Sequence, residues 1–399
     1  LFRSPKTIRA VGFKQTDQIT DLSDCINLET VSVVAEGVSN ACTIFMTLNS
    51  TGKDLTPLDL VKSLIFSLYK QTPLINEPND TWKKIVDNTK QHSKFLNNFY
   101  SSRYKKVSDR RLFKEVEKTI KKLVPNDSGM GAKKFLLQMY EDSKIFKLIN
   151  EPSQTNWSKN DYDIFESVFA ITKQFKIQVA NSFLIALIRG YQEKSVAKKS
   201  CMKVLSVMER FYFINNAVCS GRSSGLDLLY SKFAQELYQV GTRQDKHRII
   251  NIICQELNNK IASYSDFIAN VDAKLYYTKN DEKQKELVKY VLTKMERKKN
   301  RHSIPIKTSI EHIYPETPSI MKLKNANLIK NIGNLVLLED DINSKIGNKE
   351  FQSKKAYVLE KTKMIIAKEV FENATDWKDN EIIQRRNNIL VEIYEKMWK

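Results

Sequence analysis

Glycine and proline are scarce in this chain of 399 residues, which contains 11 glycines and 9 prolines. A fold with many short strands needs many turns, and these two residues make most turns. The shortage therefore argues against a many-stranded β fold and predicts a mainly helical protein. Apolar residues make up 41% of the chain and charged residues 28%, a globular balance that argues against disorder through most of the chain.

Cysteines and long apolar runs are also sparse. The five cysteines are scattered and form no Cys-x-x-Cys pair, which argues against a disulfide framework or a zinc site and indicates a reducing, cytoplasmic setting. No apolar run approaches the roughly 18 residues that a membrane span needs, and no signal peptide is visible. The first residue is Leu1 rather than Met, so we expect a fragment of a longer protein.

Acidic residues are outnumbered by basic ones. The chain has 65 Lys and Arg residues against 46 Asp and Glu residues, a formal net charge of +19. A surplus of this size indicates a polyanionic partner, most often nucleic acid, because neutralising phosphates releases condensed counterions. The alternative is that the lysines serve solubility alone.

The first 75 residues have a mixed pattern. The β-branched run 29–35 is the only convincing strand in the first half of the chain. Apolar spacing then predicts a helix over 41–48, which ends in the turn composition of 49–52. Thr56 followed by proline predicts the start of the next helix.

Residues 76–290 have apolar stripes at helical spacing and predict helices throughout. Most aromatic residues fall on these stripes, so we expect them in the core. The composition changes over 294–301, a segment with five basic residues and one acidic residue. Two β-like segments, 308–314 and 332–338, follow and lead into helices that run to the C-terminus. We place a domain boundary near 290–300.

Histidine occurs only four times, so each one can be weighed. His92 and His247 lie among polar residues and are expected on the surface. His302 belongs to the basic run and is at most a phosphate contact. His312 differs because it ends a strand-like segment that is closed by Pro315.

An acidic residue beside a histidine supplies the groups that one-metal phosphodiester hydrolysis needs. Neighbours in a strand point to opposite faces, so Glu311 and His312 converge only if the strand end bends before Pro315. Carboxylate and amide oxygens suit Mg²⁺, and a histidine with an ordinary pKa of about 6.5 can take a proton from the attacking water. An asparagine can hold the imidazole in one tautomer. The pair alone is more often structural, but the motifs that follow it indicate a catalytic site.

Four motifs stand together in the last 90 residues: Glu311-His312-Ile313-Tyr314-Pro315, Ile332-Gly333-Asn334-Leu335, Asn343, and the run 347–355 with Phe351, Lys354 and Lys355. At these residues the chain resembles the HNH-type (ββα-metal) nuclease domain at the C-terminus of GmrSD-like, modification-dependent restriction enzymes. A closing helix with Arg385 or Arg386 and the terminal Trp398 also fits. Upstream, segments within 41–62, 95–114 and 209–212 resemble the family's N-terminal domain and helical middle.

The resemblance implies a mainly α fold, in which a large helical region is followed by a C-terminal α+β HNH nuclease domain. The implied divisions are the remainder of a ParB-like sensor or NTPase-type domain (1–75), a helical middle region (76–290) and the HNH-type nuclease domain (291–399).

The activity that the resemblance implies is a DNA endonuclease or nickase that depends on Mg²⁺ or Mn²⁺ and restricts modified phage DNA. His312 would be the general base, Glu311 and Asn343 metal ligands, and Asn334 the residue that orients His312. The expected DNA contacts are Lys345, Lys354, Lys355, Arg297, Lys298, Lys299 and Arg301; the alternative for each is an exposed helix face without a DNA contact. A second basic cluster either grips DNA or is solvated: Arg103, Lys105, Lys106, Arg110 and Arg111. Two cuts on opposite strands by an enzyme with one active site would suggest a homodimer.

Two departures from the family pattern leave alternatives open. The Asp-Gly-Gln-Gln-Arg nucleotide-binding motif of the family's N-terminal domain is not found, so a nucleoside triphosphate is expected only if a longer protein supplies that motif. Glutamate stands at 311 where related domains often have aspartate, and Asp340 and Asp341 are rival ligands. The competing functions are a non-catalytic nucleic-acid-binding or regulatory module that retains the nuclease fold, and a helical protein–protein scaffold.

Overall fold

The computed structural model describes residues 56–69, 77–90, 92–222, 224–299, 307–319 and 322–398, and the backbone of β1 (Thr7–Arg9) and β2 (Ser32–Val34). These two strands pair antiparallel, and β2 lies within the predicted strand 29–35. The helix predicted over 41–48, the turn at 49–52, Arg301 and His302 lie outside the described residues, as does the side chain of His92.

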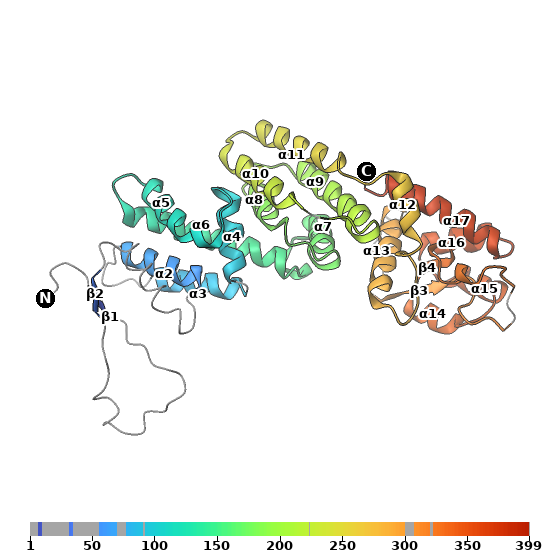
Figure 1. Cartoon of the computed structure of the whole chain (residues 1–399). Helices are drawn as coiled ribbons and strands as arrows, with labels where there is room; N and C mark the ends of the chain where they lie inside the picture. The colour runs from blue at the N-terminus through green and yellow to red at the C-terminus, as the bar shows by residue number, and fades with distance from the viewer. Residues whose placement is uncertain are drawn as a thin grey trace, which may run out of the picture. The chain divides into compact units, whose positions relative to one another are not determined.

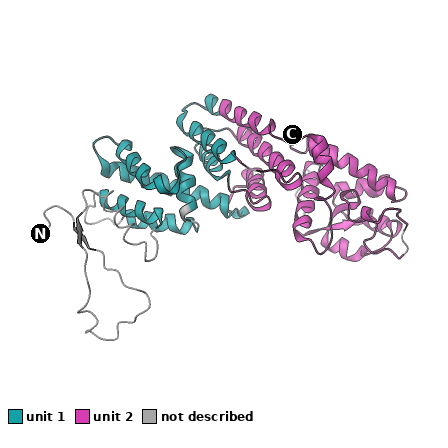
Figure 2. Cartoon of the chain, in the orientation of Figure 1, with its two compact units in different colours: residues 1–156, 179–196, 225–246 teal, residues 157–178, 197–224, 247–399 magenta. Residues whose placement is uncertain are grey.

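The chain forms two compact units (Figure 2). Unit 1 comprises 1–156, 179–196 and 225–246, and unit 2 comprises 157–178, 197–224 and 247–399. The domain boundary predicted near 290–300 falls at the end of a continuous helix inside unit 2. The division into 1–75, 76–290 and 291–399 remains a prediction.

Unit 1 is built from helices that pack around one another (Figure 1). They are α2 (Pro57–Leu68), α3 (Glu77–Asn88), α4 (His92–Arg103), α5 (Asp109–Leu123), α6 (Ser128–Asn150), α8 (Asn181–Gln192) and α10 (Leu226–Gln239), with the 3₁₀ turn η3 (Gln154–Asn156).

Helix α2 begins where the sequence predicts. Thr56 is its N-cap and forms a capping box with Asp59, in which each side chain accepts a hydrogen bond from the other residue's backbone N–H. Pro57 occupies the first turn, where its missing N–H is no loss. Leu60 and Leu64 lie one turn apart and are both buried. Local sequence thus sets both the start of the helix and its buried face.

A buried ion network joins three helices of unit 1. Asp142 on α6 is fully buried and accepts from Arg103 of α4 through Nε and Nη2, at 2.8 and 2.9 Å, and from Nη1 of Arg189 of α8 at 2.6 Å. The ring of Tyr238 lies 4.9 Å from the guanidinium carbon of Arg103 and 5.1 Å from that of Arg189. Arg103 is therefore a core residue, and the reading of it as a surface group that grips DNA is wrong.

Unit 2 combines helices with one two-stranded sheet. Its elements are η4 (Lys159–Asp161), α7 (Tyr162–Phe169), the π-helix η5 (Ala170–Gln174), α9 (Lys198–Phe211), the π-helix η6 (Tyr212–Val218), α12 (Tyr264–Val271), α13 (Glu282–Lys299), β3 (Thr308–His312), η7 (Ala326–Leu328), η8 (Ile332–Asn334), β4 (Leu335–Glu339), α14 (Asp340–Ile346), α15 (Phe351–Lys361), α16 (Ile365–Asn373), α17 (Asp379–Val391) and the π-helix η9 (Glu392–Lys396); α11 (Arg243–Asn258) contributes to both units.

One hydrophobic core runs through unit 2. It includes Phe213 from η6, Val291 from α13, Val336 from β4 and Phe371 from α16. The carboxylate of Glu296 on α13 accepts from the first backbone N–H groups of α16, Ile365 N at 2.6 Å and Ile366 N at 3.0 Å, which satisfies donors that a helix start leaves free. These hydrogen bonds fix the start of α16 to α13.

Strands β3 and β4 pair antiparallel, with Thr308 opposite Glu339 and His312 opposite Leu335. The predicted β-like segment 332–338 begins too early, because Ile332–Asn334 forms the 3₁₀ turn η8. Asn331 caps this turn by accepting from Gly333 N at 2.9 Å. A Cβ at Gly333 would clash with the backbone carbonyl of Ile382 on α17, so the glycine permits α17 to pack closely on η8.

Two further predictions concern disulfide bonds and membrane-spanning helices. Among the described residues, Cys201, Cys219 and Cys254 are free cysteines. In the part of the chain that the structure describes, no helix is both long and apolar enough to cross a membrane.

Substitution of Asp142 by Ala tests the buried ion network. It leaves two buried guanidinium groups without their carboxylate, and we expect the free energy of unfolding to fall by about 3–5 kcal/mol. Glu141→Ala is the matched control, because Glu141 is exposed and pairs only with Lys144; we expect a change within about 0.5 kcal/mol. Urea denaturation of both variants measures the difference, and equal losses would contradict a structural role for the network.

Candidate functional site

The candidate site is built on β3, β4, α14 and α15. The antiparallel ladder continues past the end of β3, where Ile313 N donates to Asn334 O at 2.8 Å. His312 is the last residue of β3 and is buried. Its ring stacks on Tyr277, with ring centres 5.2 Å apart. The histidine that the sequence singles out therefore sits at a well-ordered strand end.

The amide of Asn334 holds the exit of β3 in place. Its Oδ1 accepts from Tyr314 N at 2.7 Å and Trp377 Nε1 at 3.0 Å, and its Nδ2 donates to the carbonyls of Tyr314 and Ile329, both at 2.9 Å. The side chain is fully buried. Because Oδ1 and Nδ2 each make two hydrogen bonds to other groups, Asn334 fixes the backbone after His312. It does not orient the imidazole by a direct hydrogen bond.

Burial controls the protonation of His312. It lowers the pKa of His312 to about 4; the Glu316 carboxylate opposes this, and the ammonium groups of Lys354 and Lys279 add to it. The buried Nε2 atom has no hydrogen-bond partner in the described residues. A neutral imidazole with a free ring nitrogen can accept a proton, so the ring has the form that a general base requires.

Glu311 is paired with a lysine that the sequence assigns to another task. Lys354 of α15 is 1% exposed, and its Nζ donates to Glu311 Oε1 at 2.6 Å and to the backbone carbonyl of His312 at 2.7 Å. Burial raises the pKa of Glu311, and the Lys354 ammonium opposes the rise. The alternative that Lys354 lies on an exposed helix face is wrong, because its ammonium is buried and pairs inside the site; its contact with a phosphate remains a prediction.

Asn343 reaches β3 from α14. Its Nδ2 donates to Ser309 Oγ at 2.8 Å and more weakly to the carbonyl of Ile310 at 3.3 Å. Because the amide nitrogen is anchored, the oxygen Oδ1 is the atom left for a ligand role. Glu311, Asn343 and Lys354 are thus all tied to the one strand that carries His312.

The remaining predicted site residues are exposed, or form hydrogen bonds or ion pairs with other parts of the fold. Asp340 and Asp341, the rival ligands, are exposed in the first turn of α14, and Lys345 is exposed in its last turn. Lys355 donates to the carbonyl of Ala374 at 2.6 Å. The basic end of α13 is neutralised, since Arg297, Lys298 and Lys299 pair with Glu166, Glu392 and Glu369 respectively.

Sequence reasoning overlooked three contributors to the site. Trp377 completes the hydrogen bonding of Asn334, Tyr277 covers the His312 ring, and Glu316 opposes the lowering of its pKa. Arg385, noted only as part of a closing helix, donates to the carbonyls of Ile332 and Gly333 at 3.2 and 2.7 Å. None of these belongs to a motif that names its partner, so only the fold reveals them.

Comparison with known families bears on this same region. The model of the GmrSD restriction endonuclease C-terminal domain matches residues 261–392. This segment is similar to a restriction endonuclease domain. It contains β3, β4, α14, α15 and every residue placed around His312 above, which supports a GmrSD-like restriction endonuclease relationship. No curated protein matches the chain.

Substitution of Asn334 by Ala separates a structural clamp from a catalytic group. The variant leaves buried donors and acceptors of Tyr314, Ile329 and Trp377 unpaired, so we expect the free energy of unfolding to fall by about 3 kcal/mol. Asn373→Ala is the control, because this exposed asparagine bonds only to Glu369 of its own helix; about 0.5 kcal/mol or less is expected. Chemical denaturation would contradict the clamp if Asn334→Ala were as stable as the control.

Because the pKa of His312 is lowered, we expect the free energy of unfolding to depend on pH when it is measured in the presence of a metal chelator. Its folded pKa is about 4 and its unfolded value about 6.5, so between these pH values only the unfolded chain binds the proton. The free energy of unfolding should therefore fall by about 3 kcal/mol as the pH drops from 6.5 to 4. His312→Gln should lack this part of the pH dependence. Urea denaturation of both proteins at pH 7, 5.5 and 4.5 gives the free energy of unfolding at each pH. The same dependence of this free energy on pH in the wild type and in His312→Gln would refute the prediction.

Proposed function

We propose that the chain is a DNA endonuclease or nickase of the HNH (ββα-metal) type that acts in the restriction of modified phage DNA. The observation that carries this proposal is the His312 ring, whose Nε2 is unpartnered and which lies next to Glu311 within the segment similar to restriction endonucleases. DNA as the partner also fits the net charge of +19.

In the proposed reaction, neutral His312 takes a proton from water as the water oxygen attacks the phosphorus of a phosphodiester. The P–O bond to the leaving oxygen breaks, and that oxygen takes up a proton. The lowered pKa keeps His312 neutral near pH 7, and it also makes the ring a weaker base than an ordinary histidine. Asn334 and Lys354 hold the backbone on either side of the ring.

Two residues of the site carry donors for a divalent cation, while no cluster of three or more His, Cys, Asp or Glu side chains that could hold a metal occurs among the described residues. Glu311 supplies a carboxylate and Asn343 an amide oxygen, the hard donors that Mg²⁺ and Mn²⁺ prefer. We propose Glu311 and Asn343 as the metal-holding residues. When bound, such a metal would stabilise the negative charge that develops on the phosphate and the leaving oxygen.

A second candidate is a non-catalytic DNA-binding module that keeps this fold. The ion pair between Lys354 and Glu311 favours it, because the ammonium already satisfies one oxygen of the proposed ligand. The two candidates differ in one respect: a nuclease needs His312 for turnover, whereas a binding module does not.

Supercoiled-plasmid cleavage with Mg²⁺ or Mn²⁺ tests the nuclease proposal. We expect His312→Ala to reduce cleavage by at least about 100-fold, the usual size of a general-base contribution, while folding and DNA binding persist. His247→Ala is the matched control, because His247 is an exposed histidine hydrogen-bonded to Ser200. Open-circle product would indicate nicking and linear product double-strand cutting.

Cleavage by His312→Ala at the wild-type rate would overturn the assignment of the base. Unchanged DNA binding with no metal-dependent cleavage by the wild type would favour the binding module instead.

A further inference from the structure

Two adjoining cavities of unit 2 form a groove between α7, η5 and α13. Each has a volume of about 550 Å³, a size typical of ligand sites. They share Phe169, Gln174, Glu286 and Tyr290 as lining residues, so they are one continuous depression, here called the α7–α13 groove. It lies outside the His312 site and has no task in the proposed cleavage.

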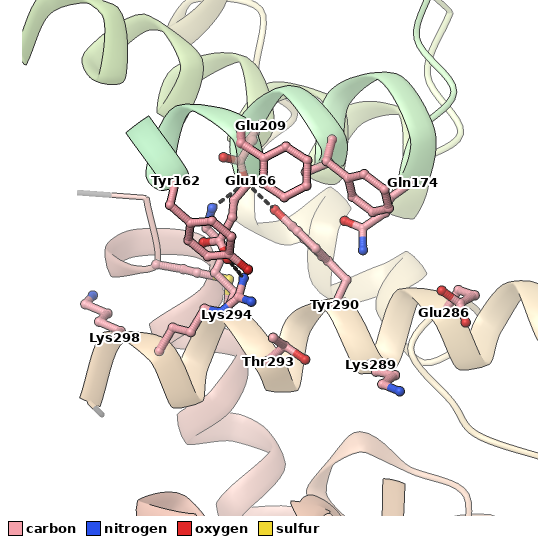
Figure 3. Close-up of a pocket in the computed structure, with 15 residues that line it drawn as sticks. Tyr162, Glu166, Gln174, Glu209, Glu286, Lys289, Tyr290, Thr293, Lys294 and Lys298 are labelled. Carbon is pink, nitrogen blue, oxygen red and sulfur yellow. Dashed lines mark hydrogen bonds and ion pairs between the residues drawn. The ribbon is translucent and has the colours of Figure 1, made fainter. Parts of the chain in front are cut away.

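The floor of the groove is a buried, fully occupied polar cluster. Glu209 accepts from Ser167 Oγ at 2.5 Å, from Tyr290 Oη at 2.7 Å and from the Nζ of Lys294. Figure 3 shows Tyr290 and Lys294 extending from α13 toward this carboxylate. The ammonium, hydroxyl and phenol donors outweigh burial and keep the pKa of Glu209 lowered. The floor is thus rigid and electrically compensated.

The walls carry positive charge that is not compensated. Three basic residues of the lining are paired: Lys294 with Glu209, Arg297 with Glu166, and Lys298 with Glu392. Five others form no ion pair with any described residue: Lys173, Lys176, Lys274, Lys283 and Lys289. The charge of Lys283 contributes to the lowered pKa of Asp281, which does not line the groove. Glu282 pairs with Lys285, which leaves Glu286 as the single unpaired acid among the described lining residues. The groove therefore has an excess of four unpaired positive charges.

Aromatic rings accompany this charge. Phe169 is 37% exposed and is the one phenylalanine of the described residues with an exposed side chain. Phe165, Phe175 and Tyr162 line the same groove and are half-buried. Accessible rings among unpaired lysines suit a ligand that has both flat aromatic groups and phosphates.

Two π-helical segments also contribute to the walls. Lys173 and Gln174 come from η5, and Asn216 and Ala217 from η6. π-helical turns are uncommon and frequently occur at functional sites, which agrees with a binding role for this groove.

We propose that the α7–α13 groove binds an unpaired strand of nucleic acid, with bases against the aromatic rings and phosphates at the free lysines. Paired bases in a duplex are stacked on one another and cannot lie on protein rings, whereas unpaired bases can. The proposal takes nucleic acid as partner from the proposed function but requires no cleavage at His312.

Binding of a fluorescein-labelled 12-nucleotide oligothymidylate to the full chain, measured by anisotropy in EDTA, tests the proposal. We expect Phe169→Ala to weaken binding by about 5- to 100-fold, the range of one lost base–aromatic contact. Leu228→Ala is the control, because it also removes an exposed apolar side chain but outside the groove. Leu228 is 62% exposed and lies on α10 of unit 1. Both sites are exposed, so neither variant should unfold; their melting temperatures check this.

Salt dependence supplies a second, independent measurement. Lys283→Gln and Lys289→Gln should each reduce the slope of log K against log salt by about 0.7, the value for one lost phosphate contact on a single strand. Lys134→Gln, an exposed lysine on α6 without an ion pair to any described residue, should leave the slope unchanged.

Wild-type affinity in Phe169→Ala, or equal slopes in all three lysine variants, would overturn the proposal. Equally tight binding of a 12-base-pair duplex with the same loss in Phe169→Ala would overturn the assignment to an unpaired strand. Because EDTA removes metal-dependent cleavage from the assay, failure here is distinguishable from failure of the nuclease proposal. His247→Ala, at an exposed histidine outside both sites, should bind the oligonucleotide like the wild type.

Discussion

The C-terminal half of unit 2 depends on the amide of Asn334. Four hydrogen bonds from one fully buried side chain join the exit of β3, the turn before η8 and Trp377. An amide is well suited to this position because it presents two donors and an acceptor without charge, and burying a charge there would cost more. The position of His312 follows from this clamp, since the chain on its C-terminal side cannot shift while the clamp holds.

Charge within the site is handled in a different way. Lys354 is nearly inaccessible to solvent, and its ammonium donates hydrogen bonds to Glu311 and to the backbone carbonyl of His312. A buried lysine next to a histidine favours the neutral ring, and burial acts in the same direction. Lys354 therefore has two effects: it compensates a buried carboxylate, and it favours the neutral form of the neighbouring imidazole.

Sequence predicted the elements better than the partners. The start of α2 could be predicted because Thr56, Pro57 and Asp59 lie within four residues of each other. The helical class and the strand ending at His312 were likewise predictable from local patterns, as was the surface position of His247. The partners of Asn334 and Lys354 were not, because Trp377 and Glu311 are each 43 residues away along the chain. The roles given to Glu311, Asn343 and His312 remain predictions, and Lys354 shows why a motif lysine need not face solvent.

Basic residues illustrate the same limit with a functional consequence. The clusters that stand out in the sequence, around Arg103 and over 297–299, are largely consumed by ion pairs inside the fold. The lysines of the α7–α13 groove are scattered over more than a hundred residues and form no motif, yet five of them form no ion pair with any described residue. Binding of a polyanion draws on charge that the protein itself has not neutralised. Local density of lysine is therefore a poorer guide to a nucleic-acid surface than the balance of cations and carboxylates that the fold brings together.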